Sequence, residues 1–221
     1  MTSEVKKLCD AFMELSTPSV SDAMDKLQIK CGCHGLVPIV MGKKFVGPAF
    51  TVRYEVAGQF KTQAGDYIDD AEEGDVIVID NGGRTYYTSW GDILTNVAVQ
   101  KKLAGTVIDG VCRDVDGIRI LDYPMYTRGH FMVTGKDRSM MVEVGGVVSI
   151  CGVQCRKGDL VMADGSGVLI IPQEVAPKVL ELARSIHEAE QKIIDSVMEG
   201  STLLEARKKY KYDSLQRPEN K

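Results

Sequence analysis

Apolar residues recur with two different periods along this 221-residue chain. Near the start, and again after Pro172, they recur every three to four positions, the period of a helix that is buried on one face. Between Pro48 and Ile171 they mostly alternate with polar residues or form short runs, which is typical of strands. The pattern therefore predicts a strand-rich core with helices at both ends of the chain.

Two helices are predicted near the start. The second begins at Thr17-Pro18, which supplies a cap and a first-turn proline. The apolar stripes are Val5, Leu8, Cys9, Phe12 and Met13 in the first helix, and Val20, Ala23, Met24 and Leu27 in the second.

The longest predicted helix covers about residues 173–200 and is expected to protrude from the rest of the fold. Gly200 ends it, and the capping box from Thr202 to Glu205 starts a last short helix. The polar tail from Lys208 is expected to fray. The apolar positions of the long helix are Val175, Val179, Leu182, Ala183, Ile186, Ile193, Ile194 and Val197.

The predicted strands begin after an irregular connection over residues 35–47. The first has Phe50, Val52, Tyr54 and Val56 on one side, and residues 105–109 form a short strand of the kind buried on both faces. Residues 142–153 and 159–171 are mainly strand.

Residues 73–80 and 157–164 resemble each other, because each is a Gly-Asp turn that leads into a strand closed by an aspartate. Two copies are too few for a repeat array. They indicate either equivalent hairpin-like positions in the core or common turn chemistry.

Composition narrows the class of protein. Hydrophobic content of 44% and charged content of 26% are ordinary for a soluble globular chain. A net charge of −4 gives no general attraction to nucleic acid or anionic lipid. No apolar run is long enough to span a bilayer, and the first residues lack the order of a signal peptide. We expect a cytoplasmic protein with one α/β domain over residues 1–221, no direct contact with nucleic acid and no membrane segment.

The six cysteines are expected to be reduced thiols rather than a disulfide framework. Cys31-Gly32-Cys33-His34 resembles half of a zinc site. A zinc site needs about four ligands, and no second cluster of this kind follows. A glycine-containing loop is the better interpretation.

The candidate chemistry lies in two segments. Gly91-Asp92-Ile93-Leu94 opens a helix predicted over residues 91–102, and Arg113-Asp114 follows a buried strand. Backbone N–H groups at a helix start attract anions. A guanidinium can bind a carboxylate through two parallel hydrogen bonds, and a carboxylate can hold a hard divalent cation. Ligands gather at the carboxyl ends of strands in α/β sheets, so both segments can face one crevice.

Two side-chain expectations accompany these segments. The helix over residues 91–102 is expected to bury Ile93, Leu94, Val97 and Ala98. Asp114 is expected to cap a short helix that carries Ile118 and Leu121.

With these motifs in place, the chain resembles the RraA-like family, which includes metal-dependent 4-hydroxy-4-methyl-2-oxoglutarate (4-carboxy-4-hydroxy-2-oxoadipate) aldolases. The resemblance rests on the following segments: residues 16–23, 47–52, 91–94, 109–114 and 158–164. The spacing from Gly91 to Arg113 is its most specific part, because it joins two motifs that are weak singly.

The resemblance implies a swivelling β/β/α three-layer sandwich that assembles as a homotrimer or hexamer, with active sites at subunit contacts. It implies that Asp114 holds Mg²⁺ or Mn²⁺, that Arg113 binds a small 2-oxo acid, and that amides of Gly91 to Leu94, including those of Asp92 and Ile93, hold its carboxylate. Asp92 would support the water network.

It further implies that a glutamate on a neighbouring subunit's C-terminal helix completes the site, for which Glu190 and Glu188 are the candidates. Lys136 is a candidate additional substrate ligand. A solvated surface charge is the alternative for all three.

The implied function is a divalent-metal-dependent class II lyase, acting by aldol cleavage of 4-hydroxy-4-methyl-2-oxoglutarate to pyruvate or by decarboxylation of oxaloacetate. Both reactions pass through a pyruvate enolate that a cation and fixed positive groups stabilise. One position departs from the aldolases, which resemble one another in an acidic residue three places after the aspartate. Here that place is Gly117, and Asp116 lies one residue early.

The alternative is a non-catalytic regulator that binds and inhibits ribonuclease E, which is the role of the members after which the family is named. Gly117 favours this alternative slightly, whereas the presence of Asp92, Arg113 and Asp114 favours the lyase. A menaquinone methyltransferase label attached to such proteins finds no support, because no glycine-rich nucleotide-binding turn is present.

Overall fold

The computed structural model describes residues 1–58 and 65–212. The tail predicted from Lys208 lies mostly outside these residues. Helices and 3₁₀ turns are α1 (Ser3–Met13), α2 (Thr17–Lys26), η1 (Asp66–Asp70), α3 (Asp92–Gln100), α4 (Val115–Ile120), η2 (Gln173–Val175), α5 (Ala176–Met198) and α6 (Leu203–Lys209). Strands are β1 (Val37–Pro38), β2 (Phe45–Val56), β3 (Val76–Thr88), β4 (Gly105–Val111), β5 (Met125–Thr127), β6 (Ser139–Val144), β7 (Val148–Ile150), β8 (Val153–Cys155), β9 (Leu160–Asp164) and β10 (Gly167–Ile171).

The main sheet is mixed. Its order is β1-β5-β4-β3-β2-β9-β10, and β6 adds to β2. Strands β2, β3, β4 and β5 are parallel to one another, and β9 is antiparallel to β2. Strands β7 and β8 form a separate hairpin. The parallel order places the carboxyl ends of β3 and β4 side by side, which positions the candidate site.

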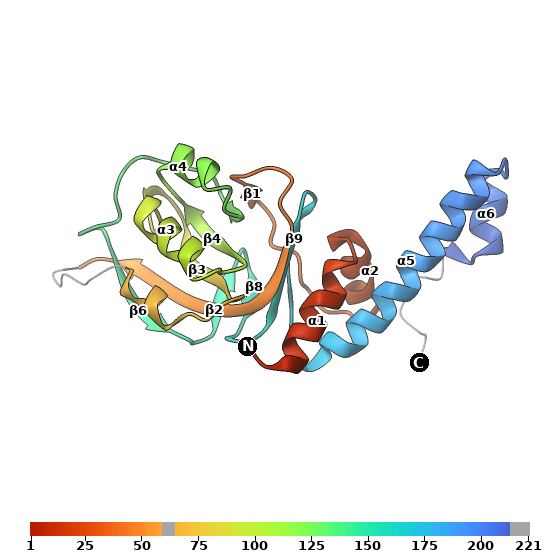
Figure 1. Cartoon of the computed structure of the whole chain (residues 1–221), viewed down its shortest axis with the longest axis horizontal. Coiled ribbons are helices and arrows are strands. Elements are labelled where there is room, and N and C mark those ends of the chain that lie inside the picture. The colour runs from red at the N-terminus through yellow and green to blue at the C-terminus, as the bar shows by residue number, and fades with distance from the viewer. Residues whose placement is uncertain (59–64, 213–221) are drawn as a thin grey trace.

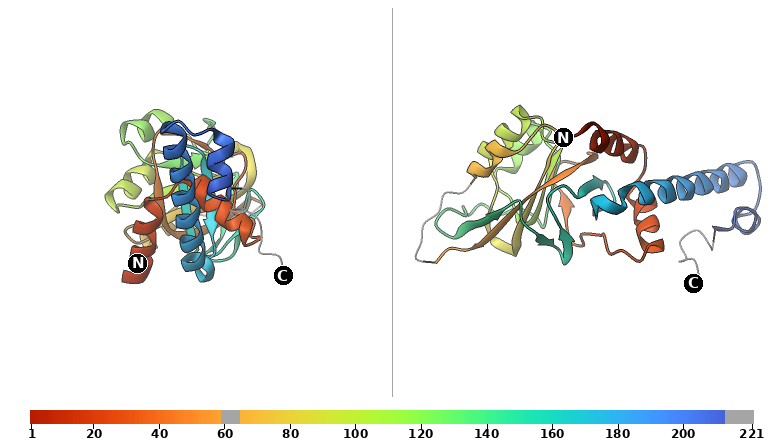
Figure 2. Two further views of the ribbon diagram at one scale, coloured as in Figure 1. Left: turned by 90° about the vertical axis from the view of Figure 1, so that its right-hand side faces the viewer. Right: turned by 90° about the horizontal axis from the view of Figure 1, so that it is seen from below.

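Three apolar clusters hold the layers together. One packs α3, α4 and η1 on one face of the parallel strands, and another fills the opposite face against β7, β8, β9 and β10. The third joins β9 and β10 to α1, α2 and α5. This arrangement confirms the expected β/β/α architecture, and α5 with α6 projects away from the sheets (Figures 1 and 2).

The terminal helices form as expected, including the capping box of Thr202 and Glu205. Ser16 rather than Thr17 caps α2, since its hydroxyl accepts the Ser19 N–H. Some apolar residues expected to be buried are instead exposed: Met13, Ile194 and Val197. These residues lie at the edges of the apolar helix faces, and only the centre of each face packs against the core. The helical period therefore predicts a wider buried face than the structure has.

The strand region differs from expectation in two places. Strand β2 begins at Phe45, inside the segment expected to be irregular, and Val56 at its end is exposed. The two similar Gly-Asp segments lead into β3 and β9, which flank β2, but only β9 enters a hairpin. Strand β3 continues past Asn81 as far as Thr88 instead.

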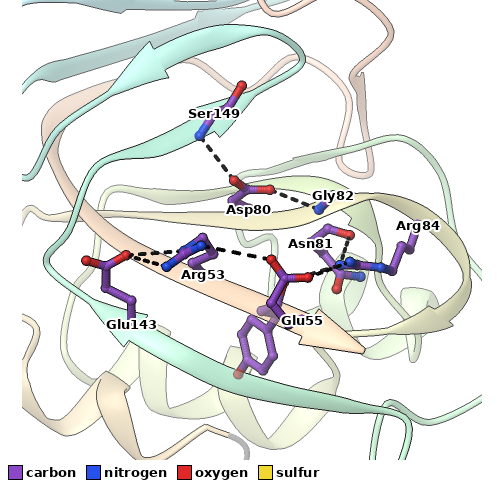
Figure 3. A network of polar contacts seen from close by, with 9 residues as sticks. Arg53, Glu55, Asp80, Asn81, Gly82, Arg84, Glu143 and Ser149 are labelled. Atoms are coloured by element: carbon purple, nitrogen blue, oxygen red, sulfur yellow. Dashed lines mark hydrogen bonds and ion pairs between the residues drawn. The ribbon is translucent and has the colours of Figure 1, made fainter. Parts of the chain in front are cut away.

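A polar network ties the β7–β8 hairpin to the main sheet (Figure 3). Asp80 accepts hydrogen bonds from the N–H groups of Gly82 and Ser149. On the neighbouring strand, the buried Asp109 accepts the Cys151 N–H at 2.7 Å and pairs with Arg128. These carboxylates therefore satisfy backbone donors that the hairpin leaves free.

A second part of the same network links β2 to β6 and to β3 (Figure 3). Arg53 pairs with Glu143 at 3.0 Å, and Arg84 pairs with Glu55 at 2.8 Å.

Among residues 1–58 and 65–212, no helix has both the length and the apolar composition required to cross a membrane.

Candidate active site

The two candidate segments meet because they follow adjacent parallel strands. Thr88 near the end of β3 is in register with Val111 at the end of β4. Two residues later, the Arg113 N–H donates to the Trp90 carbonyl at 3.0 Å. Gly91 follows Trp90 in the chain and is the N-cap of α3, so the start of this helix lies directly against Arg113.

Asp114 adopts a left-handed conformation with φ of 55°. It stands at the start of α4 as expected, but its side chain makes no capping hydrogen bond there. Its Oδ2 instead accepts the Asp92 N–H at the start of α3, at 3.0 Å, and lies 3.4 Å from Arg113 Nε. The expectation that Asp114 caps its own helix is therefore wrong, because the amide of a neighbouring helix takes the carboxylate.

Gly91 is required by this close approach rather than by a special backbone angle. A Cβ atom at this position would lie 2.6 Å from Asp114 Oδ2 and 3.2 Å from Arg113 Nε. Any larger residue would displace one of the two charged side chains. The glycine therefore preserves the contact between α3 and the Arg113-Asp114 pair.

A cavity of about 680 Å³ opens beside this contact. All six residues that were predicted to bind substrate line it. They are Gly91, Asp92, Ile93, Leu94, Arg113 and Lys136. The structure thus brings Lys136, which is distant in the sequence, to the same cavity as Arg113.

A second cavity of about 510 Å³ adjoins the first and shares Asp92 and Arg113 with it. Its other lining residues are Asp114, Val115, Asp116, Gly117, His130, Phe131 and Met132. Arg113 and Asp92 therefore lie between two chambers.

The amides at the start of α3 are only partly free. The Asp92 N–H is engaged by Asp114, and the Ile93 N–H donates to the Asp92 side chain at 2.8 Å. A ligand carboxylate can use the Gly91 and Leu94 amides directly, or displace Asp92 from Ile93. The Ile93 side chain is 74% exposed at the cavity, which contradicts the expectation that it is buried.

Gly117 faces Asp92. A Cβ atom at this position would have only the Asp92 Cβ within contact range, at 3.8 Å, so the space for a side chain exists. Asp116 lines the same second cavity, with a side chain that is 98% exposed and an ion pair to Arg119 at 3.9 Å.

The two glutamates proposed for cross-subunit roles lie on α5, which packs beside α1 and α2 and stands apart from α3 and α4 (Figure 1). Glu188 is exposed. Burial raises the pKa of Glu190, and the nearby Asp22 on α2 raises it further. Within one chain neither residue joins Asp114, so only a second chain could bring one there.

The donor set near Asp114 suits a hydrated Mg²⁺ or Mn²⁺ rather than zinc. Within residues 1–58 and 65–212, no three His, Cys, Asp or Glu side chains are grouped to hold a metal. Mg²⁺ keeps several waters and needs only one or two carboxylates plus oxygens of the substrate. The Asp114 side chain is 37% exposed and therefore accessible to such an ion.

Cys31 and Cys33 are buried free thiols, as are most of the six cysteines. Burial raises the pKa of both Cys31 and Cys33, which keeps them protonated. The segment forms a loop in which Gly32 pairs with Leu169 of β10.

Sequence reasoning missed the other walls of the first cavity. They come from β2, η1, the end of β3 with the two residues after it, the middle of α3, and the segment over residues 134–139. That segment is held in place by the pairing of Thr88 with Thr134. The residues concerned are Tyr54, Asp66, Ile68, Asp69, Thr88, Ser89, Trp90, Val97, Thr134 and Ser139. No local motif marks them, since only the tertiary fold brings them together.

Comparison with known proteins decides the family. The family described as RraA-like, Aldolase/RraA, matches residues 17–170, which is most of the chain and includes both site segments. The chain belongs to the RraA-like family.

Two relatives show how varied the names of similar proteins are. Protein DlpA of Legionella pneumophila is 36% identical over 209 residues, or 93% of this RraA-like chain, which spans only 34% of the length of DlpA. A protein of Halalkalibacterium halodurans, named provisionally as a 4-hydroxy-4-methyl-2-oxoglutarate aldolase, is 31% identical over 88% of this chain and 92% of its own length.

Solved structures support the fold. A protein from Pseudomonas syringae pv. tomato has a TM-score of 0.84 at 40% identity, over 91% of this chain and 97% of its own. Streptomyces coelicolor RraAS2, described as an unusual member of the RNase ES inhibitor RraA family, has a TM-score of 0.75 at 24% identity, over 84% and 94% of the two chains. At that identity the likeness shows the fold alone.

Proposed function

We propose that this protein is a divalent-metal-dependent carbon–carbon lyase acting on short 2-oxo acids. The observation that carries the proposal is the contact of Asp114 with both Arg113 and the first amide of α3, at the junction of two cavities. This contact supports the proposal because a helix start can attract an anion, a guanidinium can bind a carboxylate and a carboxylate can hold a cation, and all three lie close together here.

Asp114 is the residue that would hold Mg²⁺ or Mn²⁺. A bound divalent cation would supply a Lewis acid that polarises the 2-oxo group of the substrate. Asp114 can bind an ion without leaving its place, because the Asp92 N–H fixes the carboxylate in one orientation.

Arg113 and the α3 amides would bind and orient the substrate. The guanidinium of Arg113 lines both cavities and can pair with the carboxylate of a 2-oxo acid. The Gly91 and Leu94 amides add fixed positive potential at the point where negative charge develops on the enolate oxygen. Asp92 can hold a water and thereby receive or return a proton.

The proposal includes a homotrimer or hexamer in which α5 of one chain reaches the site of the next. Glu190 or Glu188 would then add a carboxylate, and Lys136 would contact the substrate from its own chain. The distance between α5 and α3 in one chain is the structural reason that a second chain is needed (Figure 1).

The experiment is oxaloacetate decarboxylation with and without Mg²⁺ or Mn²⁺, using the wild type, Asp114→Ala and Arg113→Ala. The lyase proposal predicts metal-dependent turnover that both substitutions abolish. Equal background rates for all three proteins would refute it.

The second candidate is a regulator that binds and inhibits ribonuclease E, which Gly117 favours because the aldolases resemble one another in an acid there. A direct binding measurement with ribonuclease E at micromolar protein tests this candidate. Absence of binding together with metal-dependent turnover would leave the lyase as the account of the site.

A further inference from the structure

The first cavity extends well beyond the space that a small oxo acid fills. Gly91, Leu94 and Val97 all line it and are three residues apart, so they share one face of α3. At 1.5 Å per residue, Val97 lies about 9 Å along the helix axis from Gly91. A four-carbon acid held by its carboxylate at Gly91 does not reach that far.

One side of the far end of this cavity is apolar. Leu94 and Val97 form one wall, and Ile68 from η1 and Tyr54 from β2 belong to the same apolar cluster and also line the cavity. The start of η1 lies against the Leu94 side chain, as the 3.2 Å separation of a Cβ at Gly65 from Leu94 Cδ2 shows. Helix α3 and η1 therefore enclose this end between them.

The charges at this end disfavour a second anion. Asp66 and Asp69, both on η1, line the cavity beside Ile68. The cations among the described lining residues are Arg113 and Lys136, and neither belongs to η1 or α3. A carboxylate placed near η1 would face two like charges, whereas an alkyl or aryl group would bury apolar surface.

We infer that the preferred substrates are 4-hydroxy-2-oxo acids in which C4, the carbon that bears the hydroxyl, carries an apolar substituent of three or more carbons rather than one that ends in a second carboxylate. The inference rests on the proposed lyase function. In a 4-hydroxy-2-oxo acid, the C3–C4 bond breaks and its electron pair stays on C3. The 4-hydroxyl proton leaves as C4 becomes an aldehyde carbonyl, and C3 takes up a proton to give pyruvate. The substituent leaves with the aldehyde, so the far end of the cavity would accommodate it.

The experiment compares cleavage of three synthetic substrates by the metal-loaded protein, with pyruvate release as the readout. They are 4-hydroxy-2-oxopentanoate, 4-hydroxy-2-oxooctanoate and 4-hydroxy-2-oxoheptanedioate, which carry a methyl, a butyl and a carboxyethyl group. Each fully buried methylene contributes about a fourfold gain. We expect kcat/KM for the butyl substrate to exceed that for the other two by roughly tenfold or more.

Variants of α3 locate the effect. Val97→Asp should reduce the ratio of kcat/KM between the butyl and methyl substrates about tenfold, and the isosteric Val97→Thr should reduce it less while preserving the fold. Val99→Asp adds the same charge on an exposed position of the same helix that does not line the cavity, and should leave the ratio unchanged.

The outcomes separate the two proposals. Preference for the carboxyethyl substrate, or equal ratios in Val97→Asp and Val99→Asp, would overturn this inference and leave the lyase function intact. No pyruvate from any of the three substrates or from oxaloacetate would overturn the lyase function and this inference together.

Discussion

The Asp114 carboxylate lies across the start of a helix that is not its own, where its Oδ2 accepts the backbone N–H of Asp92 at 3.0 Å. This hydrogen bond joins the segment after β3 to the segment after β4. It also fixes the orientation of the carboxylate that the account assigns to a divalent cation. The relationship can be tested from both sides of the contact.

Asp114→Asn should abolish metal binding while preserving the fold. Asparagine tolerates the left-handed backbone that Asp114 adopts, and its amide removes the charge that a hard cation requires. We expect the affinity for Mn²⁺, measured by titration calorimetry, to fall at least tenfold. The control is Asp116→Asn, an exposed carboxylate two residues away whose replacement should leave the affinity unchanged. Equal affinities for Asp114→Asn and the wild type would remove Asp114 from the metal site.

Gly91→Ala should reduce activity far more than stability. The added Cβ would stand 2.6 Å from Asp114 Oδ2 and must displace that carboxylate, although the backbone angles suit any residue. We expect kcat/KM for oxaloacetate to fall by about ten- to a hundredfold and the free energy of unfolding to change by about 1 kcal/mol. Gly165→Ala, which meets no atom within 4 Å, is the control. If both variants retained full activity, the close approach would be unimportant.

Gly117→Asp should strengthen the site. The position faces Asp92 and has room for a side chain, so a carboxylate there would stand beside Asp92. We expect Mn²⁺ affinity and aldol cleavage to rise severalfold. Ile120→Asp adds the same charge to an exposed position of α4 and serves as the control. A gain of equal size in both variants would indicate a general electrostatic effect, and a loss in Gly117→Asp would show that the site does not use an acid there.

Glu190→Gln should stabilise one chain at neutral pH. Burial against α2, with Asp22 nearby, raises the pKa of Glu190, so the folded state holds its proton more tightly than the unfolded state does. Ionisation then costs stability once the pH rises above the unfolded pKa, and the full cost is reached above the folded pKa. Urea unfolding should show a larger gain for the variant at pH 7 than at pH 4. A loss at pH 7 would instead indicate that the charged form is needed, as a cross-subunit role requires.

The ion pair of Asp109 with Arg128 should matter far more than exposed pairs do. Asp109 is buried and also accepts the Cys151 N–H of the β7–β8 hairpin. Asp109→Ala leaves both partners unsatisfied and should cost about 3 kcal/mol of unfolding free energy. Glu181→Ala breaks the exposed pair with Lys178 and should cost less than about 1 kcal/mol. Similar unfolding midpoints for the two variants would mean that the hairpin does not depend on Asp109.

The order of elements and the meeting of Gly91 with Arg113 could be predicted from the sequence, because buried parallel strands leave a clear apolar signal and their carboxyl ends must meet. The exposure of Ile93 could not be predicted, because an apolar residue that lines a cavity has the same helical spacing as one that packs in the core. The turn of Asp114 away from its own helix depends on the amide of Asp92, which the sequence does not place beside it.

The far wall of the cavity also lay beyond sequence reasoning. Ile68 and Tyr54 look like core residues, and only the packing of η1 against α3 makes them line the cavity. Lys136 was nominated by resemblance alone. The pairing of Thr88 with Thr134 is the tertiary contact that brings its segment to the cavity.

The most direct test of the lyase account is exchange of the pyruvate methyl protons with deuterium oxide, followed by proton NMR. Exchange requires enolate formation and no second substrate, so it isolates the role assigned to Arg113, Asp114 and the start of α3. The account predicts exchange that requires Mg²⁺ or Mn²⁺ and is lost in Asp114→Asn and Arg113→Ala but kept in Asp116→Asn. Exchange at the same rate in all four proteins, or at the uncatalysed rate in the wild type with metal, would contradict it.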